Sequence, residues 1–185
     1  MTSEPGDNVR KLILPLSDLA KGRDGITPAF GECLSQAASV CLEDQSHKSG
    51  VHLNVDGDFN RIFGLIWGTS TGQMRRCWAD PEVATEHGAY GIAALLIPVL
   101  TNLTIVERSR KGTGFDFWLG PMPADEVLFQ KKARLEVSGI RKGSESEIKA
   151  RLRQKKEQTK RSDGILPAYI VIVEFGEPKS RVVKR

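Results

Sequence analysis

The sequence predicts an α/β fold whose main part, from residue 81 onward, is a helix, a three-stranded antiparallel meander, a second helix and a central strand. Three observations support this. Residues 103–138 hold three runs rich in β-branched and aromatic residues, separated by turn signals. Segments with helix-start signals flank this region, at 81–97 and at 144–160. An apolar run at 167–175 lacks the alternation of a half-exposed strand, so we expect it to be buried on both faces.

The first 80 residues predict an N-terminal helix and a β-hairpin that pack on this core. Apolar residues at helical spacing predict a helix over 30–44. Two strand-like runs around Asp56-Gly57 predict the hairpin, because Asp-Gly is typical of a two-residue turn. We therefore expect a single compact domain with three parts: a disordered N-terminus at 1–10, the helix and hairpin at 11–80, and the main core with a basic tail at 81–185.

The two helices of the main core have well-defined starts. Asp80 is the expected N-cap, followed by Pro81 at the first helical position and Glu82 in the first turn. Ser144-Glu145-Ser146-Glu147 is a capping box. The helix that follows it has only a thin apolar face, so its stability depends on the cap and on a packing partner.

The meander brings acidic residues together. Residues 103–120 predict a hairpin around a loop that contains Gly112 and Gly114. If the strands are symmetric about this loop, Glu107 faces Asp116, and directly opposed like charges destabilise a hairpin unless a cation or a function requires them. In the third strand, the two-residue period places four polar side chains on one face: Lys132, Arg134, Glu136 and Ser138.

Acidic side chains at one edge of a small sheet predict a divalent-metal site. The acids concerned are Glu107, Asp116 and Glu136. Carboxylate oxygens suit Mg²⁺, which keeps several waters and can orient one for attack on phosphorus. In the alternative interpretation, Asp116 is a turn or ladder residue, and Glu136 pairs with a neighbouring cation on a solvated sheet face.

The element order from residue 81, with Asp116 in the second strand and Glu136-Val137-Ser138 in the third, resembles the core of the PD-(D/E)XK nuclease superfamily. The resemblance covers residues 81–176. It implies a restriction-endonuclease-like fold and hydrolysis of DNA that depends on Mg²⁺ or Mn²⁺. Glu107 is an extra acid outside the family pattern. The metal ligands implied by the resemblance are Glu86, Asp116, Glu136 and the backbone oxygen of Val137.

The sequence departs from the family at Ser138, where the family has a lysine that helps to position the attacking water. A hydroxyl carries no positive charge and cannot replace it. Lys132 and Arg134 share the strand face and are candidate replacements, and a lysine from the helix at 144–160 is another. Either the cation has moved to one of these positions or the site has lost its catalytic function.

Charge is distributed unevenly along the chain. Residues 131–185 contain 16 of the 27 Lys and Arg residues and only 7 of the 23 Asp and Glu residues. The resulting balance of +9, against −5 for the rest, predicts that one face binds a polyanion such as DNA. A solvated basic helix and tail is the alternative. The candidate phosphate contacts are Lys149, Arg151, Arg153, Lys155 and Lys156.

Three features predict a cytoplasmic protein that does not enter a membrane. The three cysteines are not clustered, which predicts neither a zinc site nor a disulfide framework. The polar N-terminus has no signal-peptide pattern. The longest apolar run, Tyr90 to Leu100, contains Pro98 and is too short to span a bilayer.

Two functions follow from the resemblance. The first is a Mg²⁺-dependent nuclease acting on DNA, with a role in bacterial anti-phage defence or in repair. The second is a catalytically inactive subunit of the same fold that binds nucleic acid or a partner protein, including a second copy of itself. Ser138 favours the second function, whereas Asp116 and Glu136 favour the first. A protein-interaction module unrelated to nucleases is a third possibility.

Overall fold

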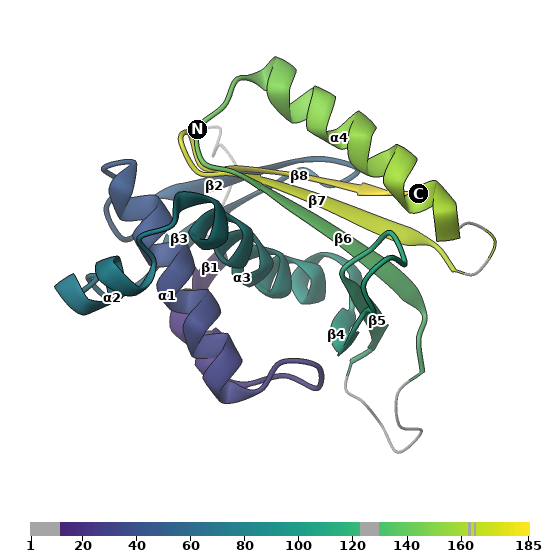
Figure 1. The fold of residues 1–185 in the computed structure, drawn as a ribbon, viewed down its shortest axis with the longest axis horizontal. Helices are drawn as coiled ribbons and strands as arrows, with labels where there is room; N and C mark the ends of the chain where they lie inside the picture. Colours follow the sequence, from purple (N-terminus) through teal and green to yellow (C-terminus); the bar gives the residue numbers. More distant parts are fainter. Residues whose placement is uncertain (1–11, 123–129, 163, 165) are drawn as a thin grey trace, which may run out of the picture.

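The structure, a computed structural model, describes residues 12–122, 130–162, 164 and 166–185. A single mixed sheet of eight strands runs through the molecule, in the order β1-β3-β2-β8-β7-β6-β5-β4. Helices α1 and α3 cover one face of this sheet, and α4 lies across the other (Figure 1). The expected disordered segment at 1–10 lies outside the described residues.

The second half of the chain has the predicted order of elements. The meander of β4, β5 and β6 is antiparallel, and β7 lies beside β6 in parallel, joined to it through α4. All seven residues of β7 are buried, as its lack of alternation predicted. The elements are α3 (Pro81–Thr101), β4 (Leu103–Arg108), β5 (Phe117–Pro121), β6 (Ala133–Ile140), α4 (Glu145–Thr159), a 3-10 turn η2 (Lys160–Ser162) and β7 (Ala168–Glu174).

The N-terminal part contains the predicted helix and hairpin, together with elements that the sequence did not predict. A short strand and a 3-10 turn precede the helix, and a short helix follows the hairpin. The elements are β1 (Leu12–Pro15), η1 (Leu16–Lys21), α1 (Pro28–Asp44), β2 (His52–Gly57), β3 (Arg61–Ile66) and α2 (Gly72–Cys77).

The turn of the first hairpin differs from the prediction. Val55 pairs with Arg61, so the connection is longer than a two-residue turn at Asp56-Gly57. Both of these residues belong to β2 instead and pair with β8 (Lys179–Lys184). Gly57 has a φ of 100°, and a Cβ there would lie 2.4 Å from the backbone oxygen of Val182. The glycine therefore serves a close strand contact rather than a tight turn.

The predicted basic tail is strand β8, in the interior of the sheet. It pairs in parallel with β2 and in antiparallel with β7. Val182 and Val183 are buried on opposite faces, one in each hydrophobic cluster. Two adjacent valines among basic residues do not show the alternation that marks a half-buried strand, which explains why the sequence did not predict it. This strand joins the parts at 11–80 and 81–185 in one sheet.

The predicted helix caps are present. The Asp80 carboxylate accepts hydrogen bonds from the backbone N–H groups of Glu82 (2.9 Å) and Val83 (3.1 Å). In the capping box of α4, the backbone N–H of Ser144 donates to Glu147 (2.6 Å) and that of Glu147 donates to Ser144 Oγ (3.4 Å). These contacts set the starting residues of the two helices that flank the meander.

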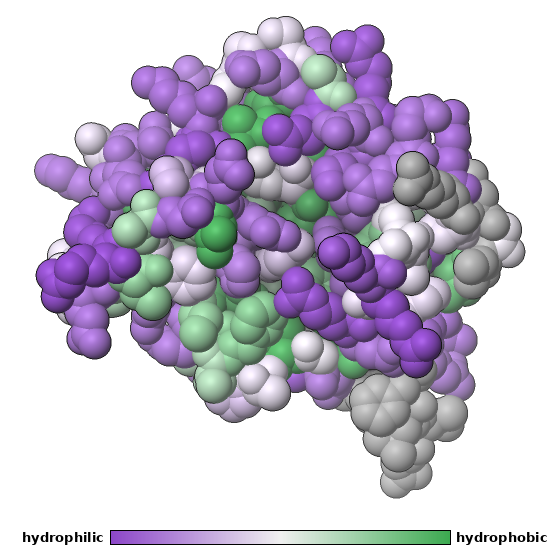
Figure 2. Space-filling view, in the orientation of Figure 1, coloured by the Kyte–Doolittle hydropathy of each residue, from purple (hydrophilic) through white to green (hydrophobic). Residues whose placement is uncertain are grey.

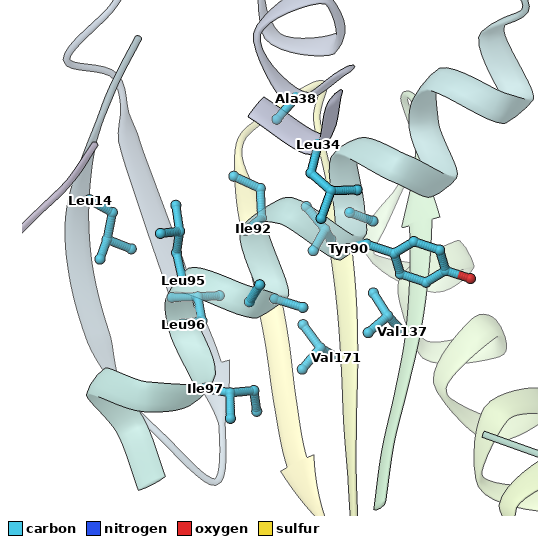
Figure 3. Packing of buried hydrophobic residues seen from close by; sticks show 14 of the residues in the cluster. Leu14, Leu34, Ala38, Tyr90, Ile92, Leu95, Leu96, Ile97, Val137 and Val171 are labelled. Carbon is cyan, nitrogen blue, oxygen red and sulfur yellow. The ribbon is translucent and has the colours of Figure 1, made fainter. Parts of the chain in front are cut away.

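Helix α3 is the centre of the main hydrophobic core (Figure 3). By length and composition it could cross a membrane, but 72% of its apolar stretch is buried inside the protein. Gly88 and Gly91 allow α1 to pack closely, since a Cβ at these positions would lie 3.1–3.3 Å from backbone atoms of Ala38 and Leu34. An apolar helix of this kind is what a globular core requires.

Helix α4 covers a second, smaller hydrophobic cluster on the opposite face of the sheet. The cluster consists of Ile140, Ile148, Ile170, Ile172 and Val183, with Leu152 packed against it. Only Ile148 and Thr159 of α4 are buried, so much of the space beneath this helix is available to polar side chains of β6.

Candidate active site

The candidate site lies where β6 continues past the start of β5. The pairing between these strands runs from Leu119 opposite Ala133 to Phe117 opposite Leu135. Asp116 lies just before β5, and its backbone N–H donates to the Leu135 oxygen at 2.9 Å. Its carboxylate Oδ2 accepts the backbone N–H of Val137 at 2.8 Å. The Asp116 carboxylate is therefore held on the edge of β6 that β5 no longer covers.

Glu136 projects from the α4 face of β6 and is almost fully enclosed, with 1% of its surface exposed. Its Oε1 accepts a hydrogen bond from Lys155 Nζ of α4 at 2.5 Å, and the same amine donates to Gln158 Oε1 at 3.2 Å. Its Oε2 is buried and has no partner among the described residues. Asp116 is the neighbouring acid, and either a proton shared between the two carboxyl groups or a bound cation would relieve the cost of this buried oxygen.

Tyr90 connects α3 to the site. Its ring packs at the border of the core, and its hydroxyl points out of the hydrophobic cluster (Figure 3). The hydroxyl oxygen lies 2.7 Å from Glu86 Oε1 and 3.1 Å from Asp116 Oδ1. Burial and the two carboxylates raise the pKa of Tyr90, so it remains a neutral donor. Because it carries one proton, it can donate to only one of the two carboxylates at a time.

The electrostatics of the site oppose the full charge of its two central acids. Burial raises the pKa of Asp116, although the hydrogen bond from Val137 and the charge of Lys155 act in the other direction. Burial and the nearby Asp116 charge raise the pKa of Glu136 to about 7, and Lys155 offsets only part of this. A bound cation would stabilise both carboxylates in their charged form.

Two hollows give access to these groups. They have volumes of about 440 and 650 Å³ and share four lining residues. The smaller is bordered by the loop from Arg108 to Phe115, and the larger by the start of α3, by β6 and by α4. Glu136 and Lys155 line the larger hollow. The residues common to both are Glu86, Tyr90, Asp116 and Gln158.

Four of the five predicted metal ligands lie together in this region. Asp116 and Glu136 are adjacent, and Glu86 joins them through the Tyr90 hydroxyl. The N–H and C=O of a strand residue point to the same side, so the Val137 oxygen opens toward the edge where its N–H meets Asp116.

The prediction that Glu107 faces Asp116 was wrong. A register shift between Ile105 and Glu107 places Glu107 opposite Trp118. Its exposed carboxylate forms an ion pair with Lys131 at 3.0 Å. The backbone N–H of Ser109 donates to the Asp116 oxygen, so Ser109 is the residue across from Asp116. The symmetric register assumed from the sequence did not account for this irregularity.

Arg134 and Lys132 do not supply the missing cation. Arg134 does share the α4 side of β6 with Glu136, but it is buried, with Nε donating to the Leu166 oxygen at 2.8 Å and Nη1 to the Thr159 oxygen at 3.1 Å. These contacts tie β6 to the end of α4 and the segment that follows it. Lys132 is exposed, precedes β6 and lines neither hollow.

The cations at the site come from α4. Ser138 Oγ accepts a hydrogen bond from Arg151 Nη1 at 2.8 Å, and Lys155 meets Glu136 one helical turn further along. The sequence had left a lysine of this helix open as a replacement for the one absent at 138. The basic residues predicted to bind phosphate thus divide into two groups. Arg151 and Lys155 line the larger hollow, whereas Lys149, Arg153 and Lys156 do not.

Sequence reasoning missed Tyr90 and Gln158, which contact the acids and Lys155. Tyr90 follows Glu86 by four residues, so both lie on one face of the helix, and a tyrosine four residues from an acid was the available signal. Gln158 follows Lys155 by three residues, so these two side chains also lie on one face of their helix. Nothing in the sequence, however, separates Gln158 from the other polar residues of α4.

The donor set suits a hard cation only in part. Within the described ranges, no group of three or more His, Cys, Asp and Glu side chains is placed to hold a metal ion. Mg²⁺, however, is usually bound through one or two carboxylates and keeps several waters. The carboxylates of Asp116 and Glu136, with the unpartnered Oε2, meet that smaller requirement.

Comparisons of the chain with models of protein families, with curated proteins and with solved structures found no match. The site geometry and the arrangement of the elements around it therefore carry the functional argument.

Proposed function

We propose that this protein is a Mg²⁺-dependent nuclease of the PD-(D/E)XK type that acts on DNA. The observation that carries the proposal is the meeting of Asp116, Glu136 and Lys155 at the point where β6 leaves β5. The order of helix, meander, helix and parallel strand is the second support. A role in bacterial defence or repair, inside the cytoplasm, is part of the same proposal.

The metal would be held by Asp116 and Glu136, with Glu86 and the Val137 oxygen beside them. When bound, Mg²⁺ supplies a Lewis acid and a water of lowered pKa for phosphodiester hydrolysis. Protein groups around the site hold the Asp116 carboxylate in a fixed orientation. The Val137 N–H fixes one oxygen of Asp116, and the Tyr90 hydroxyl lies between the other oxygen and Glu86 and can donate to either.

Lys155 takes the role that Ser138 cannot fill. Its amine lies against Glu136, 2.5 Å from Oε1, and reaches the site from α4 rather than from β6. An ammonium group there can donate a hydrogen bond to an attacking water and offset negative charge that develops at phosphorus. Arg151, bound to Ser138, adds a second positive charge on the same wall of the larger hollow.

A specific observation favours the alternative of an inactive nuclease-fold subunit that binds nucleic acid or a partner protein. Lys155 occupies Glu136 Oε1, and Val137 N–H occupies Asp116 Oδ2. Protein donors therefore already satisfy part of the acid pair without any ion. A site that has lost its catalytic role would keep such internal contacts because they stabilise the buried charges.

Cleavage assays with matched variants test the two functions. We expect the wild type to cut DNA in Mg²⁺ or Mn²⁺, and D116N to lose this activity. E107Q is the control, since its carboxylate lies away from the site. We expect K155A to lower the rate by about 100-fold, and K156A, an adjacent lysine that lines neither hollow, to leave it nearly unchanged.

The results of these assays distinguish the nuclease from the inactive subunit. Binding of DNA by the wild type without cleavage in either metal would favour the inactive subunit. Cleavage that survives in D116N would place the chemistry elsewhere. Absence of both binding and cleavage would overturn both functions on nucleic acid and would leave only the binding of a partner protein.

A further inference from the structure

We propose that the DNA enters this site as a single strand that lies across both hollows, with phosphates on either side of the reacting one bound by Arg110 and Lys111 at one end and by Lys142 at the other. The inference rests on the proposed function, since it takes the acid pair as the reacting centre. It adds a substrate class and three binding residues.

The shape of the site supports a single strand. The hollows meet at Glu86, Tyr90, Asp116 and Gln158, so the acid pair lies along one continuous path between them. Volumes of about 440 and 650 Å³ are those of pockets that hold a small molecule, not both strands of a duplex. Glu136 is only 1% exposed on this path. A flexible single strand can follow the path to this depth, whereas an intact duplex would have to remain outside.

Acids such as Glu82 and Glu147 line the larger hollow beside the acid pair, and the cations along the path are of two kinds. Several cations are already held by protein partners: Arg141 by Asp44, Arg151 by Ser138 and Lys155 by Glu136. Arg110, Lys111 and Lys142 also line the hollows, but their side chains are exposed and form no hydrogen bond or ion pair within the described chain. The held cations build the site, and the unpaired ones remain available for phosphates.

The unpaired cations lie at the two ends of the path. Arg110 and Lys111 belong to the loop between β4 and β5 and border the smaller hollow. Lys142 follows β6 and borders the larger one, near the start of α4. Figure 2 shows strongly hydrophilic side chains over the β4–β5 loop and over α4. A strand that passes the acid pair would therefore meet positive charge before and after it.

Arg108 gives the smaller hollow a surface for a base. Its guanidinium lies 5.6–5.9 Å from the ring centroids of Phe30, Tyr90 and Phe117, and the residue is exposed. An exposed guanidinium that is packed against aromatic rings can stack on an unpaired base. Stacking on a flat group, combined with a basic path for the backbone, is how proteins bind single strands without reading sequence.

Binding measurements test this inference separately from catalysis. A D116N background prevents cleavage, and the probes are a fluorescent oligonucleotide of about 12 nucleotides, within known single-strand site sizes, and the blunt duplex of the same sequence. We expect the single strand to bind at least tenfold more tightly. Replacing Arg110 and Lys111 with alanine should reduce the salt slope for the single strand by about 1.4, and K142A by about 0.7.

The matched control is K149A/R153A, which removes two charges from the side of α4 that lines neither hollow. We expect it to leave the slope nearly unchanged. Equal affinity for both probes, or a loss confined to the control, would overturn the single-strand inference while leaving the nuclease proposal standing. Tight, loop-dependent binding of the single strand by a wild type that does not cut would support the inference and count against the proposed chemistry. No binding of either probe would overturn this inference.

Discussion

The two faces of β6 differ in what they contribute. Toward α3, the strand presents Ala133, Leu135 and Val137 to the main hydrophobic core. Toward α4, it presents Arg134, Glu136 and Ser138, each buried and each bound to a polar partner. The α3 face supplies stability, since apolar burial is the main favourable term in folding. The α4 face carries buried charge, which costs stability unless it is paired and hydrogen-bonded.

The largest expected difference between the two faces is in stability. Leu135 is fully buried in the main core, so L135A should lower the free energy of unfolding by about 2–5 kcal/mol. S138A removes one acceptor for Arg151 and should cost about 1 kcal/mol. Urea unfolding followed by circular dichroism measures both. Equal effects would contradict the division of roles between the faces.

The second difference concerns pH. The pKa of Glu136 is raised from 4.5 to about 7 in the folded protein, chiefly by burial. The folded state therefore retains a proton between about pH 4.5 and 7 that the unfolded state loses, and stability falls as pH rises through this window. At about 1.36 kcal/mol per pKa unit, the fall over the whole window should be roughly 3 kcal/mol in metal-free buffer. E136Q keeps an acceptor for Lys155 but has no proton to lose, so its unfolding free energy should vary less with pH.

Urea midpoints measured at intervals from pH 5 to 8 test this expectation. Q158A is a useful control, because it changes a neutral partner of Lys155 and leaves the acid pair in place. The expectation would fail if E136Q and wild type showed the same slope in this window.

The sequence predicted those parts of the fold that depend on neighbouring residues, such as helix caps and strand periodicity. Asp80 and Ser144 cap helices where the sequence indicates, and the period of residues 133–138 separates the two faces of β6 correctly. The register of β4 was not predictable, because a shift of pairing leaves no clear sequence signal. Strand β8 was missed because its environment, not its composition, makes it a strand.

The candidate site was predictable only in part for a related reason. Glu136 lies in β6 as the sequence indicates, whereas Asp116, which was expected in the second strand, lies directly before β5. Lys155, Arg151 and Tyr90 reach the site from two helices, and their contacts depend on how these helices pack across the sheet. Charge counting grouped five basic residues of α4 together, but helix packing assigns only two of them to the hollow.

A divalent ion should act on the polar face alone. We expect Mg²⁺ or Mn²⁺ to raise the melting temperature of the wild type, because the ion relieves repulsion between Asp116 and Glu136. A gain of 1 kcal/mol corresponds to roughly 2–4 °C for a chain of this size. D116N should lose most of the increase, and E107Q should retain it. Differential scanning calorimetry with and without the ion decides this, and equal shifts in wild type and D116N would place the ion elsewhere.

The smallest expected effects separate the two sides of α4. Arg151 donates to a buried hydroxyl of β6, so R151A should lower stability by about 0.5–1.5 kcal/mol. Arg153 is exposed, and R153A should change stability by no more than about 0.5 kcal/mol. A double-mutant cycle with S138A isolates the contact, because the coupling appears only if Arg151 and Ser138 interact in solution. We expect coupling of at least about 0.5 kcal/mol for R151A with S138A and none for R153A with S138A. Coupling that is absent from both pairs would mean that α4 does not pack its Arg151 side onto β6, and the cationic wall of the larger hollow would then have to be assigned to other residues.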